Sequence, residues 1–326
     1  MHVLCTGAGG MIGRKLTARL LTEGALGGRP VTRLTLLDIE APEIPAGGGD
    51  KVVTSAVDLS MLGAAARAIA DAPDVIFHLA AVVSGEAEID FEKGYAVNCA
   101  GTRGLLEAIR QVGDYRPKLV FASSIAVYGA PFPAAIPDDF IRAPLTSYGA
   151  QKAICELLLA DYSRRGFLDG VGVRLPTIVV RPGKPNKAAS GFFSSIIREP
   201  LAGEEALLPV GEGVRHWFAS PRAAVAFLLH AAGLERERLG PHVNLTMPGF
   251  SCTVGDQIAA LARIAGPRVA ARIRHEPDAL VERIVAGWPQ NFEARRAREL
   301  GFVAEKSFDD IIHTHIEDEL GGTFVS

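Results

Sequence analysis

The sequence predicts an α/β fold with a doubly wound parallel sheet and a smaller, interleaved C-terminal region. Short apolar runs alternate with segments of helical periodicity throughout the first half of the chain, which is typical of βαβ units. The runs are continuously apolar, as expected for strands that helices cover on both faces. A glycine-rich segment joins the first apolar run to the first helical segment, as a tight turn from strand to helix requires.

The elements of the first half follow from these patterns. Strands are expected at residues 2–6, 33–38, 51–55, 74–81, 118–124 and 171–180. Helices are expected at residues 11–24, 60–71, 90–112 and 147–165. Gly166 follows the last of these helices and is suited to end it.

The chain changes character after Arg181. Residues 181–190 are rich in proline, glycine and lysine and are expected to form a loop. Helices are expected at residues 190–200, 221–235, 254–266 and 278–287, and a short strand at 242–247. We therefore expect a first domain over residues 1–180, to which the strand at 242–247 returns, and a second region over residues 181–326.

Composition and charge exclude several classes of protein. The 326 residues are 48% hydrophobic and 22% charged, as in globular proteins. The net charge of −3 argues against a nucleic-acid partner, and the lack of an apolar run of about 18 residues argues against a membrane span. The four cysteines, at positions 5, 99, 155 and 252, form no Cys-x-x-Cys pair, so we expect neither a metal site nor disulfides. No secretory signal pattern is found, and a cytoplasmic protein is expected.

The glycine-rich segment is a candidate dinucleotide site. Gly7, Gly10 and Gly13 form a Gly-x-x-Gly-x-x-Gly pattern between the first strand and the first helix. The first glycine permits the tight turn, the second lets the backbone approach a pyrophosphate, and the third lets the helix pack on the strand. A pyrophosphate there would meet unpaired N–H groups at the positive end of the helix dipole. Met11 and Ile12 complete the expected contacts, and an ordinary glycine-rich turn is the alternative.

Two acidic residues at strand ends indicate how the rest of a dinucleotide would bind. Asp38 ends the second strand, where a carboxylate can accept hydrogen bonds from the adenosine ribose and would repel a 2′-phosphate. This favours NAD over NADP, although Arg14 and Arg33 are cations close in sequence to these elements. Asp58 is expected to contact the adenine amino group with Leu59 against the ring, or else to cap the following helix.

Small residues close the strand expected at 74–81. Leu79, Ala80 and Ala81 would let a cofactor lie across the strand ends. His78 lies inside the same apolar run, and a hydrogen-bonded core histidine is the favoured interpretation of such a residue.

Three residues form a candidate catalytic group. Tyr148 and Lys152 are four residues apart near the start of a predicted helix, so they share one face. A nearby ammonium favours the phenolate form of a tyrosine, which could then act as a general base near neutral pH. Ser124 ends the fifth strand, at the carboxyl edge where doubly wound sheets bind ligands, and could hold the substrate oxygen. The alternative is a packing tyrosine and a solvated lysine.

These motifs resemble the extended short-chain dehydrogenase/reductase family over about residues 1–180. The matching residues are the glycines at 7–13, Asp58-Leu59, His78-Leu79-Ala80-Ala81, Asn98 in Asn-x-x-Gly-Thr, Ser123-Ser124-x-x-Val-Tyr-Gly and Tyr148-x-x-x-Lys152. The resemblance implies a Rossmann fold with a smaller interleaved substrate region and NAD as cofactor. It also implies that Lys152 bonds the nicotinamide ribose, that Asn98 lies near the cofactor, and that Pro176 and Thr177 lie near the nicotinamide.

The second half departs from the sugar-nucleotide epimerases of that family. Those enzymes commonly carry Asn where Thr177 stands, and an Arg closely followed by two Asp residues, whereas residues 215–222 contain no Asp. Residues 147–153, 173–190 and 198–201 and the pair Trp288-Pro289 resemble instead a sugar-acid dehydrogenase of the family. This resemblance implies oxidation of the C2 hydroxyl of a four-carbon sugar acid.

Binding a small sugar acid requires a cation for the carboxylate and polar groups for the hydroxyls. The substrate contacts we expect are Ser84, Ser124, Tyr148, Asn186, Lys187 and Arg215. Arg174 lies within a predicted strand and is expected to order a neighbouring loop instead.

Two other functions remain open at this point. One is a sugar-nucleotide epimerase or dehydratase on the same fold, and the other is a dinucleotide sensor without catalytic activity, which need not retain Ser124, Tyr148 and Lys152 together. By analogy with the family, which pairs through two long helices, a homodimer formed by the helices at 90–112 and 147–165 is expected.

Overall fold

The computed structural model describes residues 1–183 and 189–325 of the chain. These residues form two compact units. The first unit consists of residues 1–127, 144–175 and 225–246, and the second of residues 128–143, 176–224 and 247–326. Because each unit takes up several stretches of chain, the sequence passes from one to the other repeatedly.

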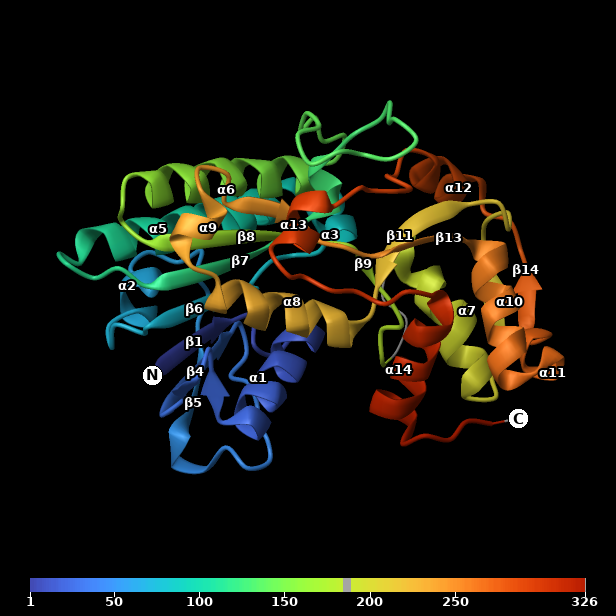
Figure 1. Cartoon of the computed structure of the whole chain (residues 1–326), viewed down its shortest axis with the longest axis horizontal. Helices are drawn as coiled ribbons and strands as arrows, with labels where there is room; N and C mark the ends of the chain where they lie inside the picture. The colour runs from blue at the N-terminus through green and yellow to red at the C-terminus, as the bar shows by residue number, and fades with distance from the viewer. Residues whose placement is uncertain (184–188, 326) are drawn as a thin grey trace. The chain divides into compact units, whose positions relative to one another are not determined.

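A parallel sheet of seven strands in the described residues forms the centre of the first unit (Figure 1). Its order is β12-β8-β7-β6-β1-β4-β5. The strands are β1 (His2–Thr6), β4 (Arg33–Asp38), β5 (Val52–Ala56), β6 (Val75–His78), β7 (Lys118–Ser124), β8 (Asp169–Leu175) and β12 (Asn244–Thr246). The doubly wound α/β fold is therefore confirmed. The chain order reverses beside β1, and ligands bind at the carboxyl ends of strands at such a point.

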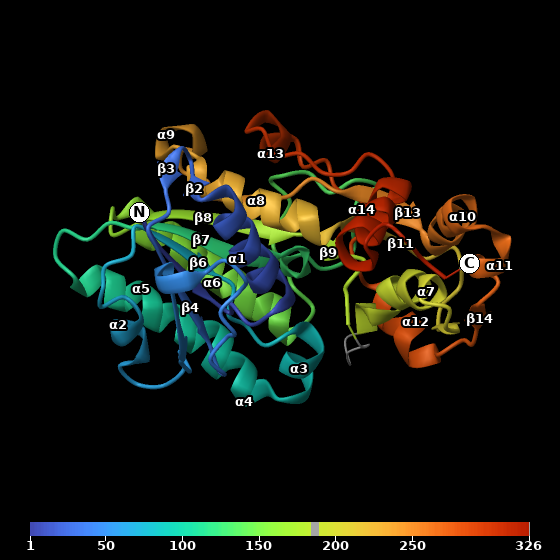
Figure 2. The same ribbon diagram turned by 90° about the horizontal axis from the view of Figure 1, so that it is seen from below.

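Helices cover both faces of this sheet (Figures 1 and 2). One face carries α1 (Met11–Glu23) and the part of α8 (Pro221–Gly233) that belongs to the first unit. The opposite face carries α2 (Ala64–Ala68), α5 (Thr102–Gln111) and α6 (Ser147–Arg164). The core between this face and the sheet is apolar, with residues such as Ile76, Leu105 and Leu159 fully or almost fully buried.

The helix expected at 90–112 contains a wider turn that the sequence did not indicate. It consists of α4 (Phe91–Gly94), a π-helical turn (Tyr95–Gly101) and α5. The carbonyl of Asn98, within the π-helical turn, accepts hydrogen bonds from Thr102 Oγ1 at 2.6 Å and from Cys155 Sγ at 3.2 Å. Side-chain donors thus form hydrogen bonds to a backbone carbonyl within the π-helical turn. Turns of this kind are frequent at functional sites.

Several other expected elements are shorter than predicted; the strand expected at 74–81, for example, ends at His78. The helix expected at 60–71 is reduced to α2, because Asp58 Oδ1 binds the backbone and hydroxyl of Ser60 and holds residues 58–61 in a turn. The strand expected at 171–180 ends at Leu175, since Pro176 lacks the N–H that a continuing strand would need.

The second unit is built around a three-stranded sheet of order β13-β11-β9. Its strands are β9 (Thr177–Ile178), β11 (Arg215–Ala219) and β13 (Phe250–Thr253). Its larger helices are α7 (Phe192–Leu201), α10 (Val254–Ala265), α12 (Ala279–Ala286) and α14 (Phe308–Leu320). These elements share an apolar core that includes Phe193, Ile197 and Phe218.

Short elements complete the described chain. They are β2 (Ala25–Leu26), β3 (Arg29–Pro30), α3 (Ser84–Ile89), β10 (Ala206–Leu208), α9 (Arg236–Leu239), α11 (Pro267–Ala270), β14 (Ile273–His275) and α13 (Arg295–Glu299).

His78 is a core residue of the first unit, as expected. Its Nδ1 lies 2.7 Å from Thr6 Oγ1, and its Nε2 lies 2.9 Å from Thr102 Oγ1. Burial, together with the charge of Lys152, lowers the pKa of His78 to about 3. The ring is therefore neutral under ordinary conditions and links β1 to α5 through hydrogen bonds.

Candidate active site

The backbone is so close to Gly7 and Gly13, at the turn from β1 into α1, that neither position has room for a β-carbon. A β-carbon on Gly7, whose φ is +76°, would lie 2.6 Å from the backbone nitrogen of Ala80. A β-carbon on Gly13 would lie 2.4 Å from the carbonyl oxygen of Gly7. Gly10 is the N-cap of α1 and makes no side-chain capping bond. The start of α1 therefore lacks a side-chain cap and an acidic residue, and its N–H groups suit a pyrophosphate.

Asp38 lies at the carboxyl end of β4, beside the glycine turn. Its Oδ2 accepts a hydrogen bond from the N–H of Gly9 at 2.9 Å, and its Oδ1 accepts one from Ile39 at 2.7 Å. Arg33 begins β4 at the opposite end of the strand and pairs with Asp71. Arg14 donates to the carbonyl of Gly9 at 2.8 Å. The Asp38 carboxylate thus lies beside the glycine turn, and Arg33 does not offset its charge. Its contact with an adenosine ribose stays a prediction.

Asp58 does not cap the following helix α2, whose N-cap is Gly63, but holds a turn before it. Its Oδ1 accepts bonds from the backbone N–H of Ser60 at 2.9 Å and from the Ser60 hydroxyl at 2.6 Å. It therefore fixes the turn after β5, and Leu59 beside it is nearly buried. Contact of either residue with adenine stays a prediction.

The structure places the three candidate catalytic residues at the carboxyl end of β7 and the start of α6. Ser124 is the last residue of β7, and its Oγ accepts a hydrogen bond from the N–H of Ala126 at 3.1 Å. Lys152 Nζ lies 5.6 Å from the centroid of the Tyr148 ring. A β-carbon on Gly149 would lie 2.2 Å from the carbonyl oxygen of Ala126. Glycine at this position therefore lets α6 approach the segment that follows Ser124.

Lys152 is almost fully buried in this arrangement. Its Nζ donates to the carbonyl of Ala122 in β7 at 2.8 Å and lies 4.8 Å from the centroid of the Phe121 ring. Burial lowers the pKa of Lys152 to about 8, against the ordinary value of 10.5. The side chain is thus mostly an ammonium near neutral pH and loses its proton in mildly alkaline solution. An ammonium here favours the phenolate of the neighbouring Tyr148.

Asn98 uses its side chain to hold protein segments together. Its Oδ1 accepts from the N–H of Val82 at 2.9 Å, and its Nδ2 donates to the Val82 carbonyl and to Gln151 Oε1 at 2.7 Å. This ties the segment after β6 to the helix that carries Lys152. Gln151 was not predicted at this position, because nothing in the sequence pattern distinguishes it from a surface position of the helix.

The remaining expected site residues are distributed over both units. Leu79, Ala80 and Ala81 follow β6 in the first unit, Ser84 begins α3, and Met11 and Ile12 begin α1. Pro176 follows β8 directly in the chain and belongs to the second unit. Asn186 and Lys187 lie outside the described residues.

Arg215 is engaged within the second unit. It begins β11, donates to the carbonyl of Ser251 at 3.2 Å, and lies 3.8 Å from Asp256 Oδ2. Its side chain is 40% exposed. The cation is therefore only loosely paired, and a stronger carboxylate ligand could compete for it.

Two side-chain pairs were not predicted from the sequence. Arg174 forms a two-pronged ion pair with Glu156 of α6, and its expected role in ordering a neighbouring loop stays a prediction. The two residues are 18 positions apart, and no periodicity connects a strand residue with a helix residue at that distance. In the second unit, Thr177 Oγ1 lies 2.6 Å from His216 Nε2, and Trp288 packs on the His216 ring.

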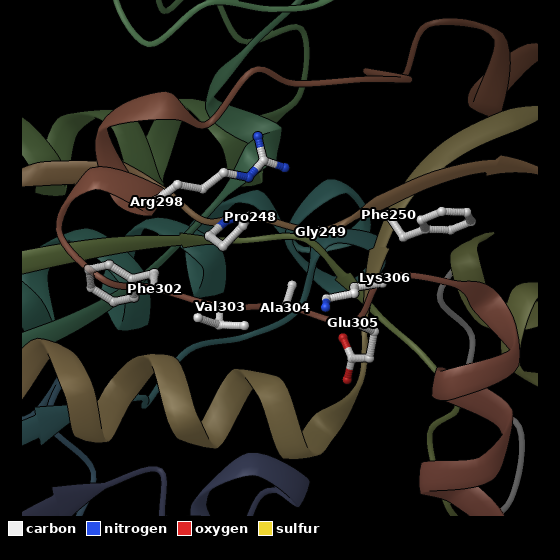
Figure 3. A pocket seen from close by; sticks show the side chains of 9 residues that line it. All are labelled: Pro248, Gly249, Phe250, Arg298, Phe302, Val303, Ala304, Glu305 and Lys306. Carbon is white, nitrogen blue, oxygen red and sulfur yellow. The ribbon is translucent and has the colours of Figure 1, made fainter.

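A hollow of about 510 Å³ lies within the second unit (Figure 3). It is lined by Pro248, Gly249, Phe250, Arg298, Phe302, Val303, Ala304, Glu305 and Lys306. None of the predicted site residues lines it. We therefore place the candidate chemistry at the carboxyl edge of the seven-stranded sheet.

No helix in residues 1–183 and 189–325 combines the length and the apolar character needed to cross a membrane. Those same residues hold no cluster of histidine, cysteine, aspartate and glutamate side chains suited to a metal ion.

Comparison with known proteins places this geometry in a family. The sequence profile of the NAD dependent epimerase/dehydratase family matches residues 3–245. The chain belongs to this family. Its cofactor is NAD, and the uncapped start of α1, the two glycines that exclude β-carbons and Asp38 fit that cofactor.

Individual relatives cover the whole chain. A D-erythronate dehydrogenase from Cupriavidus necator is 49% identical over 322 residues, which are 98% of each chain. A D-erythronate dehydrogenase from Haemophilus influenzae is 40% identical over 98% of this chain and 100% of its own. A crystal structure described as a nucleoside-diphosphate-sugar epimerase from Agrobacterium tumefaciens is 60% identical, with a TM-score of 0.97 over 99% of this chain and 95% of its own.

Proposed function

We propose that the chain is an NAD-dependent dehydrogenase that oxidises the C2 hydroxyl of D-erythronate to give 2-dehydro-D-erythronate, a 2-oxo-tetronate. The observation that carries the proposal is the grouping of Ser124 and Tyr148 with the buried Lys152 at the carboxyl edge of the sheet. The names of the two curated relatives that span the chain support the choice of substrate.

Each of the three residues has a separate role in this mechanism. The Ser124 hydroxyl donates a hydrogen bond to the substrate oxygen at C2. The phenolate of Tyr148 removes the proton from that oxygen, so the proton ends on the tyrosine oxygen. The Lys152 ammonium stabilises the phenolate before transfer and bonds the nicotinamide ribose. NAD, when bound, accepts the hydride from C2.

The chain's remaining task is to position the reactants, which supplies much of the rate in such reactions. The proposed cofactor contacts are Gly7, Gly10, Met11, Ile12, Gly13, Asp38, Asp58, Leu59, Leu79, Ala80, Ala81, Asn98, Ser124, Tyr148, Lys152 and Pro176. For the sugar acid we propose Ser84, Asn186, Lys187 and Arg215 besides Ser124 and Tyr148. A guanidinium suits the carboxylate because its paired donors match the two oxygens.

A second candidate function is a nucleotide-sugar epimerase. It is favoured by the description of the 60% identical crystal structure. Thr177 and the stretch at 215–222, which lacks Asp, depart from that group of enzymes. We therefore rank it below the dehydrogenase.

A substrate panel separates the two functions. The enzyme is incubated with NAD or NADP and with D-erythronate, its stereoisomers, longer aldonates, or nucleotide sugars, and the absorbance of the reduced cofactor is followed. We expect net NADH formation with D-erythronate and little activity with NADP, because Asp38 repels the 2′-phosphate. Conversion of a nucleotide sugar without net NADH, and no response to any aldonate, would support the epimerase instead.

The pKa of Lys152 predicts a pH dependence. Because burial has lowered this pKa to about 8, the ammonium is lost as the pH rises through 8, and with it the stabilisation of the Tyr148 phenolate. We expect kcat/KM to decline above about pH 8 in the wild type. In Lys152→Arg the cation persists above pH 8, so the remaining kcat/KM should not decline in that range. If kcat/KM of that variant still declines above about pH 8, the decline is caused by a group other than Lys152.

We further propose that the protein is a cytoplasmic homodimer. All four cysteines are free thiols, as expected in a reducing compartment. On α6, Ile154 is 39% exposed and Leu157 is 58% exposed, and their spacing places them on one side of the helix. A partner helix would remove this apolar surface from water.

Leu157→Glu tests the dimer. A buried carboxylate in the helix contact would be strongly unfavourable, so we expect sedimentation equilibrium to show a dimer for the wild type and a monomer for the variant. Thr22→Glu, at an exposed position of α1 on the opposite face of the sheet, should remain dimeric. If the Leu157→Glu variant is still a dimer, the contact between the subunits does not involve this face of α6.

A further inference from the structure

We propose that Ser123, Glu156 and Arg174 form a buried positioning device, which fixes the strand tip bearing Ser124 against the helix bearing Tyr148 and Lys152. The inference deepens the proposed function and relies on it for its kinetic readout. None of the three residues is assigned a contact with substrate or cofactor; they act through the residues beside them.

Glu156 forms the centre of the device. It lies one helical turn after Lys152 on α6, and its side chain is fully buried. Its Oε1 accepts hydrogen bonds from Ser123 Oγ at 2.6 Å and from Arg174 Nε at 2.8 Å. Its Oε2 accepts from Arg174 Nη2 at 2.8 Å. Each carboxylate oxygen is thus engaged by a donor from the sheet.

The two donors stand side by side, immediately before the strand ends. Ser123 of β7 pairs in register with Arg174 of β8, and Ser124 pairs with Leu175. The carboxylate therefore joins α6 to both strands one residue before the edge where the chemistry is proposed. Arg174 Nη1 also donates a hydrogen bond to Thr246 Oγ1 of the next strand in the sheet, β12, at 3.3 Å.

The network is better suited to fixing the positions of the elements it joins than to raising the stability of the fold. Removing two charges from water is costly, and replacing a buried ion pair by packed apolar residues is often neutral or stabilising. A buried pair with directional hydrogen bonds does, however, fix a single register between the elements it joins. Fixed register matters here, because a displacement of about 1 Å at a reacting group can cost about 100-fold in rate.

The charge of Glu156 supports the same residues in a second way. Burial is the main influence on Lys152 and lowers its pKa, whereas Cys155, Cys99 and, least of the three, Glu156 act in the opposite direction. The charge of Glu156 thus makes a small contribution to keeping Lys152 in its ammonium form, next to Tyr148.

The first test removes one hydrogen bond of the device. Ser123→Ala frees the tip of β7 from Glu156 and leaves the ion pair in place. We expect kcat for D-erythronate oxidation to fall about 10-fold, with KM and the NADH dissociation constant nearly unchanged. Ser123→Thr, which restores a hydroxyl at the same place, should regain most of the rate.

Ser163→Ala is the matched control. Ser163 is a buried serine at the other end of α6, and its hydroxyl lies near Gly170 at the amino end of β8. The same substitution there should leave kcat within about twofold, because no reacting group is positioned by that end of the helix. Should Ser123→Ala not fold, Arg174→Lys, which retains the charge but loses the fork, is expected to show the same loss of kcat.

A second readout needs no substrate and so separates this inference from the proposed function. The ultraviolet absorbance of the Tyr148 phenolate is titrated with NAD present, by subtracting the matching Tyr148→Phe protein in each background. We expect the Tyr148 transition to move about one pH unit higher in Ser123→Ala. If the Tyr148 transition shifts but the enzyme does not oxidise D-erythronate, the positioning role of Ser123 would be supported and the proposed substrate would be wrong. Unchanged kcat and an unchanged titration in Ser123→Ala would overturn the inference.

Discussion

Tyr148→Phe is expected to lower kcat for D-erythronate oxidation by about 1,000-fold, within the range that a general base contributes. The substitution removes only the oxygen that takes the proton and leaves the ring against which Lys152 lies, 5.6 Å from Nζ. The packing of α6 and the fold should therefore be retained. Stopped-flow or steady-state absorbance of NADH measures the rate.

The affinity for NADH provides the control for this variant. Because the phenol oxygen is one contact among many, the dissociation constant from fluorescence titration should change by less than about fivefold. Tyr95→Phe, which removes a phenol oxygen outside the proposed site, should retain the wild-type rate. A Tyr148→Phe enzyme with near-normal kcat would mean that another group takes the proton.

Arg174→Met is expected to reduce the free energy of unfolding by about 3–5 kcal/mol, the usual cost of leaving one partner of a buried ion pair uncompensated. The reason is that Glu156, whose side chain is fully buried, would keep its charge after the cation that pairs with it is removed. Urea-induced unfolding, followed by circular dichroism, measures the change.

The double variant Glu156→Met/Arg174→Met separates lost charge pairing from lost packing. With both charges removed, most of the lost stability should return, because no ion remains buried alone. The activity should not return with it, since the tie between α6 and the tip of β7 stays broken. A double variant less stable than Arg174→Met would show that the pair contributes mainly through stability.

The sequence predicted those parts of the protein whose signals are local. The glycines at 7, 10 and 13 span the turn after β1 and the first turn of α1, and Asp38 ends the next strand of the main sheet. Tyr148 and Lys152 are one turn apart on a helix whose predicted bounds were nearly correct. Periodicity and spacing are enough for features of this kind.

Features that depend on long-range pairing could not be predicted in the same way. Glu156 was one helix position among many until the fold placed Arg174 and Ser123 against it. His216 and Thr177 are 39 residues apart and meet only because β11 pairs with β9. The π-helical turn at Asn98 depends on donors from Thr102 and Cys155, and Cys155 lies on another helix.

The position at which the sugar acid is oxidised tests the central claim most directly. D-erythronate uniformly labelled with ¹³C is incubated with the enzyme and NAD, and the carbon spectrum of the product is recorded. A phenol, an ammonium and a serine hydroxyl gathered at the C2 oxygen predict a new carbonyl signal coupled to the carboxylate carbon, as in a 2-oxo acid. A carbonyl at C3 or C4, or unchanged erythronate beside an active nucleotide-sugar reaction, would contradict this assignment.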